Sequence, residues 1–178
     1  MITELYVDGG VIASNPSMIG GTWACCLISE RGFCHGHSGV VQPHEITNAF
    51  EAVSNNQSEM MALLEGLRRL PEGFNGTIYS DSQITLGWAF MGWKWKNIPS
   101  WMTFVYQIQR KRLLKWDEIK YVLLDGHPTK KQLEAGIGKR GHPVSEHNVW
   151  CDEACRQAGT TFMESIARNI PVGFYASR

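Results

Sequence analysis

ITELYVDGG, residues 2–10, is the stretch on which the fold prediction rests. Leu5 and Val7 alternate with Tyr6, and the run then reaches Asp8 and two glycines, a pattern typical of a short β-strand that stops at a carboxylate. The glycines leave room for a substrate or a second chain segment to approach that carboxylate. An anionic side chain in such a place needs a cation, a metal ion or water as its partner. Read alone, the stretch is better explained by a plain Asp-Gly turn, so the rest of the chain has to decide.

The composition favours a single domain in the cytoplasm. The chain has 178 residues, which suits one domain with a sizeable core. It has no apolar run of about 18 residues and no basic-then-apolar start, so we expect neither a membrane span nor a signal peptide. The five cysteines form no C-x-x-C pair, which favours reduced cysteines that serve as small core residues. Cys151 and Cys155 lie one helical turn apart and should point inward, with a metal site there as a second interpretation.

Charge is unevenly distributed although the net charge is zero. Residues 94–140 hold eleven of the seventeen Lys and Arg residues and four of the seventeen acids, which leaves +7 in this span and −7 in the rest. A basic half beside an acidic half is typical of a protein that binds a polyanion on one surface and cations on another. Any single cluster is also explained by a solvated helix face.

The remaining pattern predicts an α/β fold in which a three-stranded meander precedes alternating strands and helices. Residues 22–29 and 33–41 have the pattern of two strands joined by a Gly-bearing turn, and they form the meander with residues 2–8. Residues 43–54 are predicted to be a polar connection. Further strands and helices are predicted at residues 55–70, 77–80, 82–90, 101–115, 118–124 and 147–158.

Two segments near the C-terminus are less regular. Residues 129–146 are rich in Gly, Lys and polar side chains, which predicts a mobile loop with one helical turn at 131–135. Residues 161–169 are expected either to extend the last helix or to form another. The final residues are expected to fray.

Four acids stand at the ends of these predicted elements. Asp8 and Asp81 end two strands, whereas Glu59 and Asp152 lie in the first turns of two helices. Sites in open α/β sheets form beyond the carboxyl ends of strands, so the two aspartates become neighbours if their strands are adjacent. Carboxylates that meet at one point cannot all ionise without cations, and oxygen ligands select hard ions such as Mg²⁺ or Mn²⁺. Two such ions are typical of phosphodiester hydrolysis.

Five motifs carry a family resemblance over residues 1–160. They are YVDGG at the first strand, NNQSEMMALLEGL around Glu59, YSDSQ around Asp81, DGH after the fifth strand and NVWCDEACRQA around Asp152. With these motifs in this order, the sequence resembles type 1 ribonuclease H. The resemblance implies a ribonuclease H-like α/β fold, with a five-stranded mixed sheet in the order 3-2-1-4-5 and helices on both faces. It also implies a ribonuclease H-like domain over residues 1–160 and a C-terminal helix or tail over 161–178.

The same resemblance implies an activity. It would be a metal-dependent endonuclease that cuts the RNA strand of RNA–DNA hybrids and leaves 5′-phosphate and 3′-hydroxyl ends. Asp8 would bridge two Mg²⁺ ions bound with substrate, Mn²⁺ being a substitute; Glu59 and Asp81 would bind one ion alongside it, and Asp152 would help to hold the other. We expect a cytoplasmic monomer whose partner is the hybrid and not a membrane. A nuclease of the same fold that cuts a structured RNA or a DNA junction is one alternative. A non-catalytic hybrid-binding module is another, and the intact acid set argues against it.

The catalytic histidine has two candidates. His127 follows the fifth predicted strand in the sequence DGH and matches the mobile histidine of the family, which assists proton transfer or product release. However, 24 residues separate it from Asp152, more than the family usually has. His142, in KRGHP, lies nearer to that acid. We favour His127 because of its position after a strand, although a lone loop histidine is often only a surface residue.

Further side chains are candidates for substrate binding. Interleaved tryptophans and lysines can contact bases and phosphates, although the tryptophans would equally suit a core and the lysines a solvated surface. We expect Trp93 or Trp95 to be partly exposed and Trp101 to be buried. Asn55 and Asn56 either contact a 2′-hydroxyl near Glu59 or cap a helix. The substrate-binding candidates are Gly9, Gly10, Asn55, Asn56, Trp93, Lys94, Trp95 and Lys96.

Overall fold

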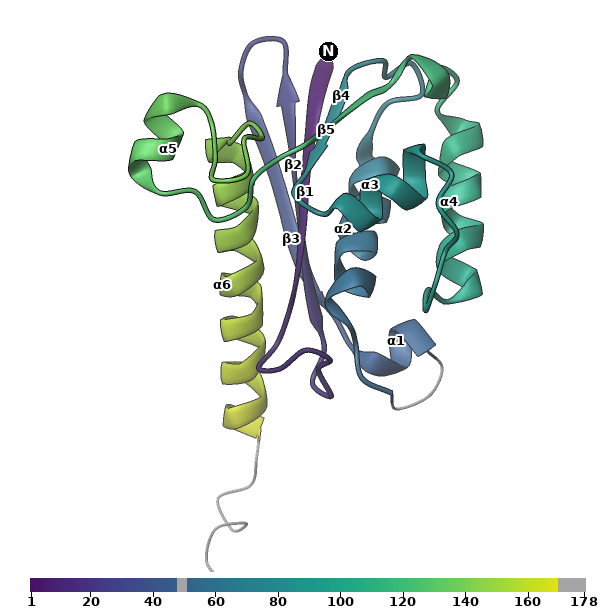
Figure 1. Cartoon of the computed structure of the whole chain (residues 1–178). Helices are drawn as coiled ribbons and strands as arrows, with labels where there is room; N and C mark the ends of the chain where they lie inside the picture. The colour runs from purple at the N-terminus through teal and green to yellow at the C-terminus, as the bar shows by residue number, and fades with distance from the viewer. Residues whose placement is uncertain (48–50, 170–178) are drawn as a thin grey trace, which may run out of the picture.

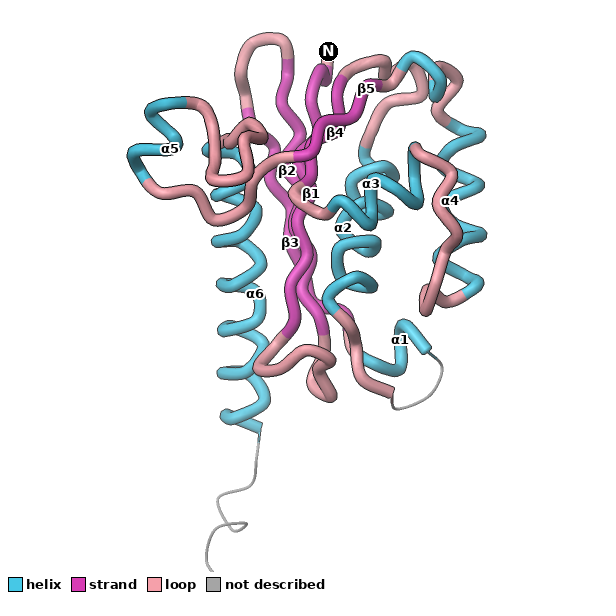
Figure 2. The backbone as a smooth tube through the Cα atoms, in the orientation of Figure 1, coloured by secondary structure: helices cyan, strands magenta, loops and turns pink. Residues whose placement is uncertain are grey.

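The computed structural model describes residues 1–47 and 51–169. Its strands are β1 Ile2–Val11, β2 Gly21–Ser29, β3 Cys34–Val41, β4 Thr77–Ser80 and β5 Lys120–Leu123. Its helices are α1 Pro43–Thr47, α2 Asn55–Arg69, α3 Gln83–Phe90, α4 Ser100–Arg112, α5 Lys130–Ala135 and α6 Glu146–Asn169, with a 3-10 turn at Trp116–Glu118. The strands form one sheet in the order β3-β2-β1-β4-β5, which confirms the predicted topology. Figures 1 and 2 show α2, α3 and α4 on one face of the sheet and α6 on the other.

The strand β1 lies at the centre of this sheet. Leu5 and Val7 are fully buried in the core on the α2 face, and Tyr6 is buried on the α6 face beside Cys151. β1 runs antiparallel to β2 and parallel to β4. The prediction that β1 stops at Asp8 was wrong, because β2 continues to pair with it as far as Val11.

The helix α2 packs into the core on its face of the sheet. Met60, Leu63 and Leu67 have no exposed surface, as their helical spacing predicts. The N-cap is Ser54, whose hydroxyl accepts from the backbone N–H of Gln57 while the Gln57 side chain accepts from the backbone N–H of Ser54. The prediction of a cap at Asn55 or Asn56 was therefore wrong, and both residues lie within the first turn.

The outer helix α4 is shorter than the sequence pattern suggests. It ends at Arg112, whose guanidinium donates to the carbonyl oxygens of Leu67 and Leu70 at 2.6 and 2.8 Å and so ties α4 to the end of α2. The prediction that Trp101 is buried was wrong: it is half-buried, and its indole N–H donates to the carbonyl of Ile46 at 2.8 Å.

The hairpin of β2 and β3 contains a disulfide that the sequence did not predict. Cys26 and Cys34 are bonded, with Cα atoms 6.1 Å apart. In the β2–β3 register Cys26 lies opposite Gly36 and Cys34 opposite Ile28, so the two cysteines are diagonal neighbours on the same face. The expectation of five reduced cysteines was therefore wrong for this pair. It holds for Cys25, Cys151 and Cys155, which are free and buried in the described structure.

The segment between β5 and α6 is built from specific contacts. Thr129 and Gln132 form a capping box at the start of α5, and Gly136 ends that helix with a left-handed φ of 72°. The predicted loop with one helical turn therefore contains a complete short helix. The segment predicted as the polar connection 43–54 begins with α1, and part of it, 48–50, lies outside the described residues.

The last helix is longer than predicted. α6 runs without interruption from Glu146 to Asn169, so residues 161–169 extend it and do not form a separate element. Figure 1 shows it beside the sheet, beginning below the β2–β3 turn and reaching the lower end of the sheet. The expected fraying of the final residues concerns 170–178, outside the described residues. None of the described helices combines the length and the apolar composition needed to cross a membrane.

Candidate active site

Asp8 and Asp81 meet where β1 and β4 separate. Glu4 lies opposite Thr77 and Tyr6 opposite Tyr79 in the parallel ladder. Continuing the same offset of 73 residues places Asp8 opposite Asp81, two residues beyond the last pair. The adjacency of the two strands thus brings together the two acids that the sequence placed at strand ends.

Glu59 reaches the same point from the first turns of α2. Its Oε2 accepts from the backbone N–H of Gly9 at 3.1 Å, and its Oε1 lies 3.5 Å from the amide nitrogen of Asn55. The helix approaches so closely that a Cβ on Gly9 would lie 2.3 Å from the backbone nitrogen of Glu59. Gly9 therefore allows the backbone of α2 to approach the strand beside Asp8.

The three acids Asp8, Glu59 and Asp81 form a compact donor set. One carboxylate oxygen from each lies within 4.8 Å of the other two. Burial, followed by the charges of Asp81 and Asp152, raises the pKa of Asp8 to about 8. Burial and then Asp8 raise the pKa of Glu59 well above its usual range, and burial also raises the pKa of Asp81. Such a set can hold its full negative charge only against a cation, and its oxygens are those that Mg²⁺ and Mn²⁺ prefer.

Asp152 faces this set from α6. Its side chain is 46% exposed and lies outside the 4.8 Å group, but it lines the same cavity of about 510 Å³ as Asp8 and Glu59. Asn148, one helical turn earlier, is buried, and its amide nitrogen lies 3.5 Å from Oδ2 of Asp81. Sequence reasoning missed Asn148 as a site residue, although its i,i+4 spacing to Asp152 was a usable signal.

The structure places His127, and not His142, beside these acids. Nδ1 of His127 is 3.4 Å from Oδ2 of Asp152, and its side chain is 78% exposed. His127 has a left-handed φ of 49° and lines the same cavity. His142 is not among the described residues that line it, and its carbonyl accepts from Gly138 N–H at 2.9 Å in the loop behind.

An ion pair fixes the loop that carries His127. Asp125, with 5% of its side chain exposed, accepts from the backbone N–H and the Nε of Arg140 at 2.6 and 2.7 Å. The adjacent Gly126 passes so close to Asp81 that a Cβ there would lie 2.2 Å from its Oδ2. The inserted residues between His127 and Asp152 are thus folded back and anchored, which lets a histidine distant in sequence reach the site.

Seven of the eight candidate substrate contacts line one of two cavities. Gly9, Gly10 and Asn55 line the carboxylate cavity. Asn56, Trp93, Lys94 and Lys96 line a neighbouring cavity of about 770 Å³. Trp93 is 41% exposed, which confirms that one of the two tryptophans is partly exposed. Trp95 is half-buried between the rings of Trp88 and Tyr106 and is not among the described residues that line either of these two cavities.

The RNase H family model matches residues 2–160 of this chain, a range that includes all four acids. The chain belongs to the RNase H family. Ribonuclease H from Aeromonas salmonicida is 32% identical, and the alignment covers 88% of this chain and 89% of that protein. Ribonuclease H from Tolumonas auensis is 27% identical over 94% of this chain and 96% of that protein. The chain is accordingly a ribonuclease H enzyme, a nuclease of the hydrolase class.

Solved structures agree on the RNase H fold. The crystal structure of RNase H1 from the archaeon Halobacterium salinarum superposes with a TM-score of 0.58 at 17% identity, covering 89% of this chain and 97% of that one. The N-terminal RNase H domain of a Mycobacterium tuberculosis protein gives 0.58 at 14% identity, covering 92% and 99%. At these identities the likeness concerns the fold alone.

Proposed function

We propose that this RNase H hydrolyses the RNA strand of RNA–DNA hybrids endonucleolytically, with divalent cations held by its four acids. The observation that carries the proposal is the convergence of Asp8, Glu59 and Asp81 within 4.8 Å, with Asp152 on the same cavity. RNase H family membership supplies the substrate class. Products with 5′-phosphate and 3′-hydroxyl ends complete the proposal.

The residues present suit two Mg²⁺ ions, or Mn²⁺ in their place. Asp8, Glu59 and Asp81 would hold one, and Asp8 with Asp152 would hold the other. The raised pKa of Asp8 supports this, because cations would compensate the mutual repulsion of the carboxylates. When bound, such ions activate a water molecule and stabilise the charge on the phosphate and on the leaving oxygen.

The protein's own contribution is to position the acids and to move a proton. Gly9 N–H and the Asn55 amide orient the two oxygens of Glu59, and Asn148 orients Asp81. We propose that His127 exchanges a proton with the attacking water or the leaving group. Its exposure beside Asp152 supports the role, since an exposed imidazole can reach both solvent and substrate.

Discrimination between RNA and DNA would depend on the first turn of α2. Asn55 is half-buried next to Glu59, and Asn56 is exposed at the edge of the neighbouring cavity. Amides at these places suit a 2′-hydroxyl, which both donates and accepts a hydrogen bond. The exposed Lys94 and Lys96 would bind phosphates of the opposite strand, with Trp93 against its sugars or bases.

A cleavage assay tests the proposal. A labelled RNA–DNA hybrid, single-stranded RNA, duplex RNA and duplex DNA are incubated in parallel with Mg²⁺, with Mn²⁺ or with a chelator. We expect cutting of the hybrid alone, only with a cation, and not by the Asp8→Asn variant. Asp117→Asn changes an exposed acid that is not among the described residues lining the carboxylate cavity, so it is the matched control and should retain wild-type turnover.

Each alternative has its own outcome in this assay. Cutting of a structured RNA or a DNA junction in preference to the hybrid would replace the substrate. Hybrid binding without cutting in either metal would favour a non-catalytic module, and wild-type turnover by Asp8→Asn would overturn the metal-ligand assignment. We also propose that the chain is a cytoplasmic monomer with its catalytic domain over residues 1–160. Size-exclusion chromatography with light scattering tests the oligomeric state.

A further inference from the structure

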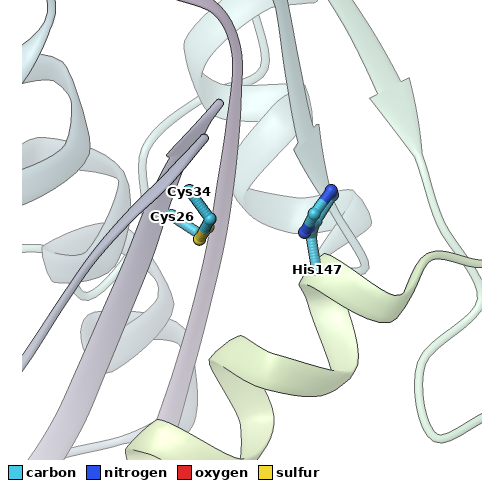
Figure 3. Close-up of side chains that lie close together, drawn as sticks. All are labelled: Cys26, Cys34 and His147. Atoms are coloured by element: carbon cyan, nitrogen blue, oxygen red, sulfur yellow. A yellow bond between two sulfur atoms is a disulfide. The ribbon is translucent and has the colours of Figure 1, made fainter. Parts of the chain in front are cut away.

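A second cluster of metal-binding side chains lies apart from the carboxylates. Cys26 on β2, Cys34 on β3 and His147 in the first turn of α6 each present a donor atom within 4.8 Å of the other two. Figure 3 shows the two cysteines together on the strand pair and the His147 ring opposite them on the helix. Cys26 is buried, His147 is half-buried and Cys34 is exposed on the edge strand.

The arrangement is held by the fold and not by the disulfide alone. The β2–β3 register turns both cysteines toward α6, and the Tyr6 ring lies 5.0 Å from the His147 ring and supports it. The backbone N–H of His147 is bonded to the Ser145 hydroxyl at 3.1 Å, which fixes the start of the helix. The packing of α6 therefore keeps the His147 imidazole next to Cys26 and Cys34 whether or not the two sulfurs are bonded to each other.

We propose that Cys26, Cys34 and His147 bind one zinc-class cation when the two thiols are reduced. Two thiolates and an imidazole select Zn²⁺ or a comparable soft ion, whereas the carboxylates of the other site select hard ions. Two thiolates also neutralise the double charge of the cation, which favours binding beside the buried Cys26. Three protein ligands leave the fourth tetrahedral position to water.

The geometry needs only a small side-chain movement. Two zinc–sulfur bonds of about 2.3 Å at a tetrahedral angle separate the sulfurs by about 3.8 Å. Cα atoms 6.1 Å apart are compatible with that separation as well as with a disulfide. Because Cys34 is exposed, its side chain is free to turn toward the ion.

The disulfide and the metal site are alternative states of the same residues. Reduction by a phosphine breaks the sulfur–sulfur bond, consumes one water and yields two thiols and the phosphine oxide. Binding of the cation then releases the two thiol protons. The bound ion would cross-link the first turn of α6 to β2 and β3. The same helix carries Asn148 and Asp152, so this link would hold the helix that brings these two residues to the carboxylate site.

Cobalt spectroscopy on the full chain tests the proposal. The protein is reduced with a phosphine, freed of metals by a chelator, and titrated with Co²⁺ in excess Mg²⁺, which occupies the carboxylate site without binding thiolates. We expect one Co²⁺ per chain with a near-ultraviolet thiolate-to-cobalt charge-transfer band, displaced by Zn²⁺. Protein left in the disulfide form should show no such band. Zn²⁺ should also protect Cys34 from a thiol reagent.

Variants assign the ligands. Cys34→Ser changes an exposed residue, so it should fold, and it should abolish the band; His147→Gln should weaken Co²⁺ binding and change the visible bands that report tetrahedral geometry. Cys25→Ala, which removes a thiol on the opposite face of the sheet, is the control and should leave the band unchanged. Absence of a band in the reduced wild-type protein would overturn the proposal. So would a band that survives Cys34→Ser and disappears in Cys155→Ala.

Discussion

Replacing Asp8 by Asn should make the metal-free protein more stable. Asp8 is 6% exposed, and its pKa is raised from 3.8 to about 8 by burial and by its acidic neighbours. The folded state therefore binds the carboxyl proton of Asp8 more tightly than the unfolded chain does. This tighter binding stabilises the folded state fully below pH 3.8, and the stabilisation is lost as the pH rises toward about 8. Asn has a similar shape and no charge, so it avoids this cost.

The expected gain follows from the pH. At pH 7, about 3 units above the unfolded pKa but below the folded pKa of about 8, Asp8 keeps its proton in the folded state, whereas the unfolded chain is ionised. Holding that proton costs about 4 kcal/mol of folding stability, at about 1.4 kcal/mol per unit. At pH 4.5 the same reasoning leaves about 1 kcal/mol. Asp8→Asn should therefore unfold at a higher urea concentration than the wild type at pH 7 in a chelator, and at nearly the same concentration at pH 4.5.

Added Mg²⁺ should make the wild-type protein more stable than the Asp8→Asn variant. A cation that binds only the folded state stabilises the wild-type protein by mass action, and Asp8→Asn should gain little because it lacks the shared ligand. Asp117→Asn, an exposed acid, should follow the wild type throughout. An Asp8→Asn variant that is no more stable than the wild type at pH 7 without metal, or whose gain is the same at pH 4.5, would refute the reasoning.

Three further predictions concern the surroundings of the site. His127→Ala should slow hybrid cleavage by about 100-fold without abolishing it, as loss of a proton-transfer group does; a larger effect of His142→Ala would show that the wrong histidine was chosen. Gly9→Ala should lower the free energy of unfolding by about 2–3 kcal/mol and remove most of the activity, because its Cβ would lie 2.3 Å from the α2 backbone. Gly73→Ala is the control: a Cβ there would have nothing within 4 Å, so urea unfolding and turnover should not change. Ending the chain after Thr160 should keep activity and change stability by less than about 1 kcal/mol, since residues 161–168 are largely exposed; loss of folding by circular dichroism would contradict a domain that ends there.

Local patterns explain why much of the architecture could be predicted. The alternation of Leu5, Tyr6 and Val7 predicts a β-strand, and the spacing of Leu63 and Leu67 predicts one face of a helix. Boundaries were less predictable because they depend on partners. β1 continues past Asp8 only because β2 lies alongside it. Ser54 caps α2 through reciprocal hydrogen bonds with Gln57, whereas the sequence offered the two adjacent asparagines as equally suitable caps.

The candidate site shows the same division. The four acids could be recognised in the sequence by residue type and order, but the distances between them could not be predicted from it. Asp8 faces Asp81 because β1 and β4 pair in one parallel register, and Glu59 reaches them because Gly9 has no side chain. The approach of His127 to Asp152 depends on the anchored loop, and no local pattern reports an ion pair between residues 15 positions apart.

By itself, the sequence determined the amphipathic helices and the acids that an RNase H needs, and its resemblance to type 1 ribonuclease H implied the strand order. These properties follow from short-range periodicity and from the order of the motifs, both of which can be read from the sequence without knowing the fold. Only the tertiary structure decided which histidine faces the acids, which cysteines meet and that His147 joins them. Those pairings are contacts between segments far apart in the chain, and they exist only once the sheet has paired and α6 has packed across it. For the opening strand, the sequence supplied the carboxylate of Asp8, and the packing of β2, β4 and α2 around it supplied the surroundings that raise its pKa.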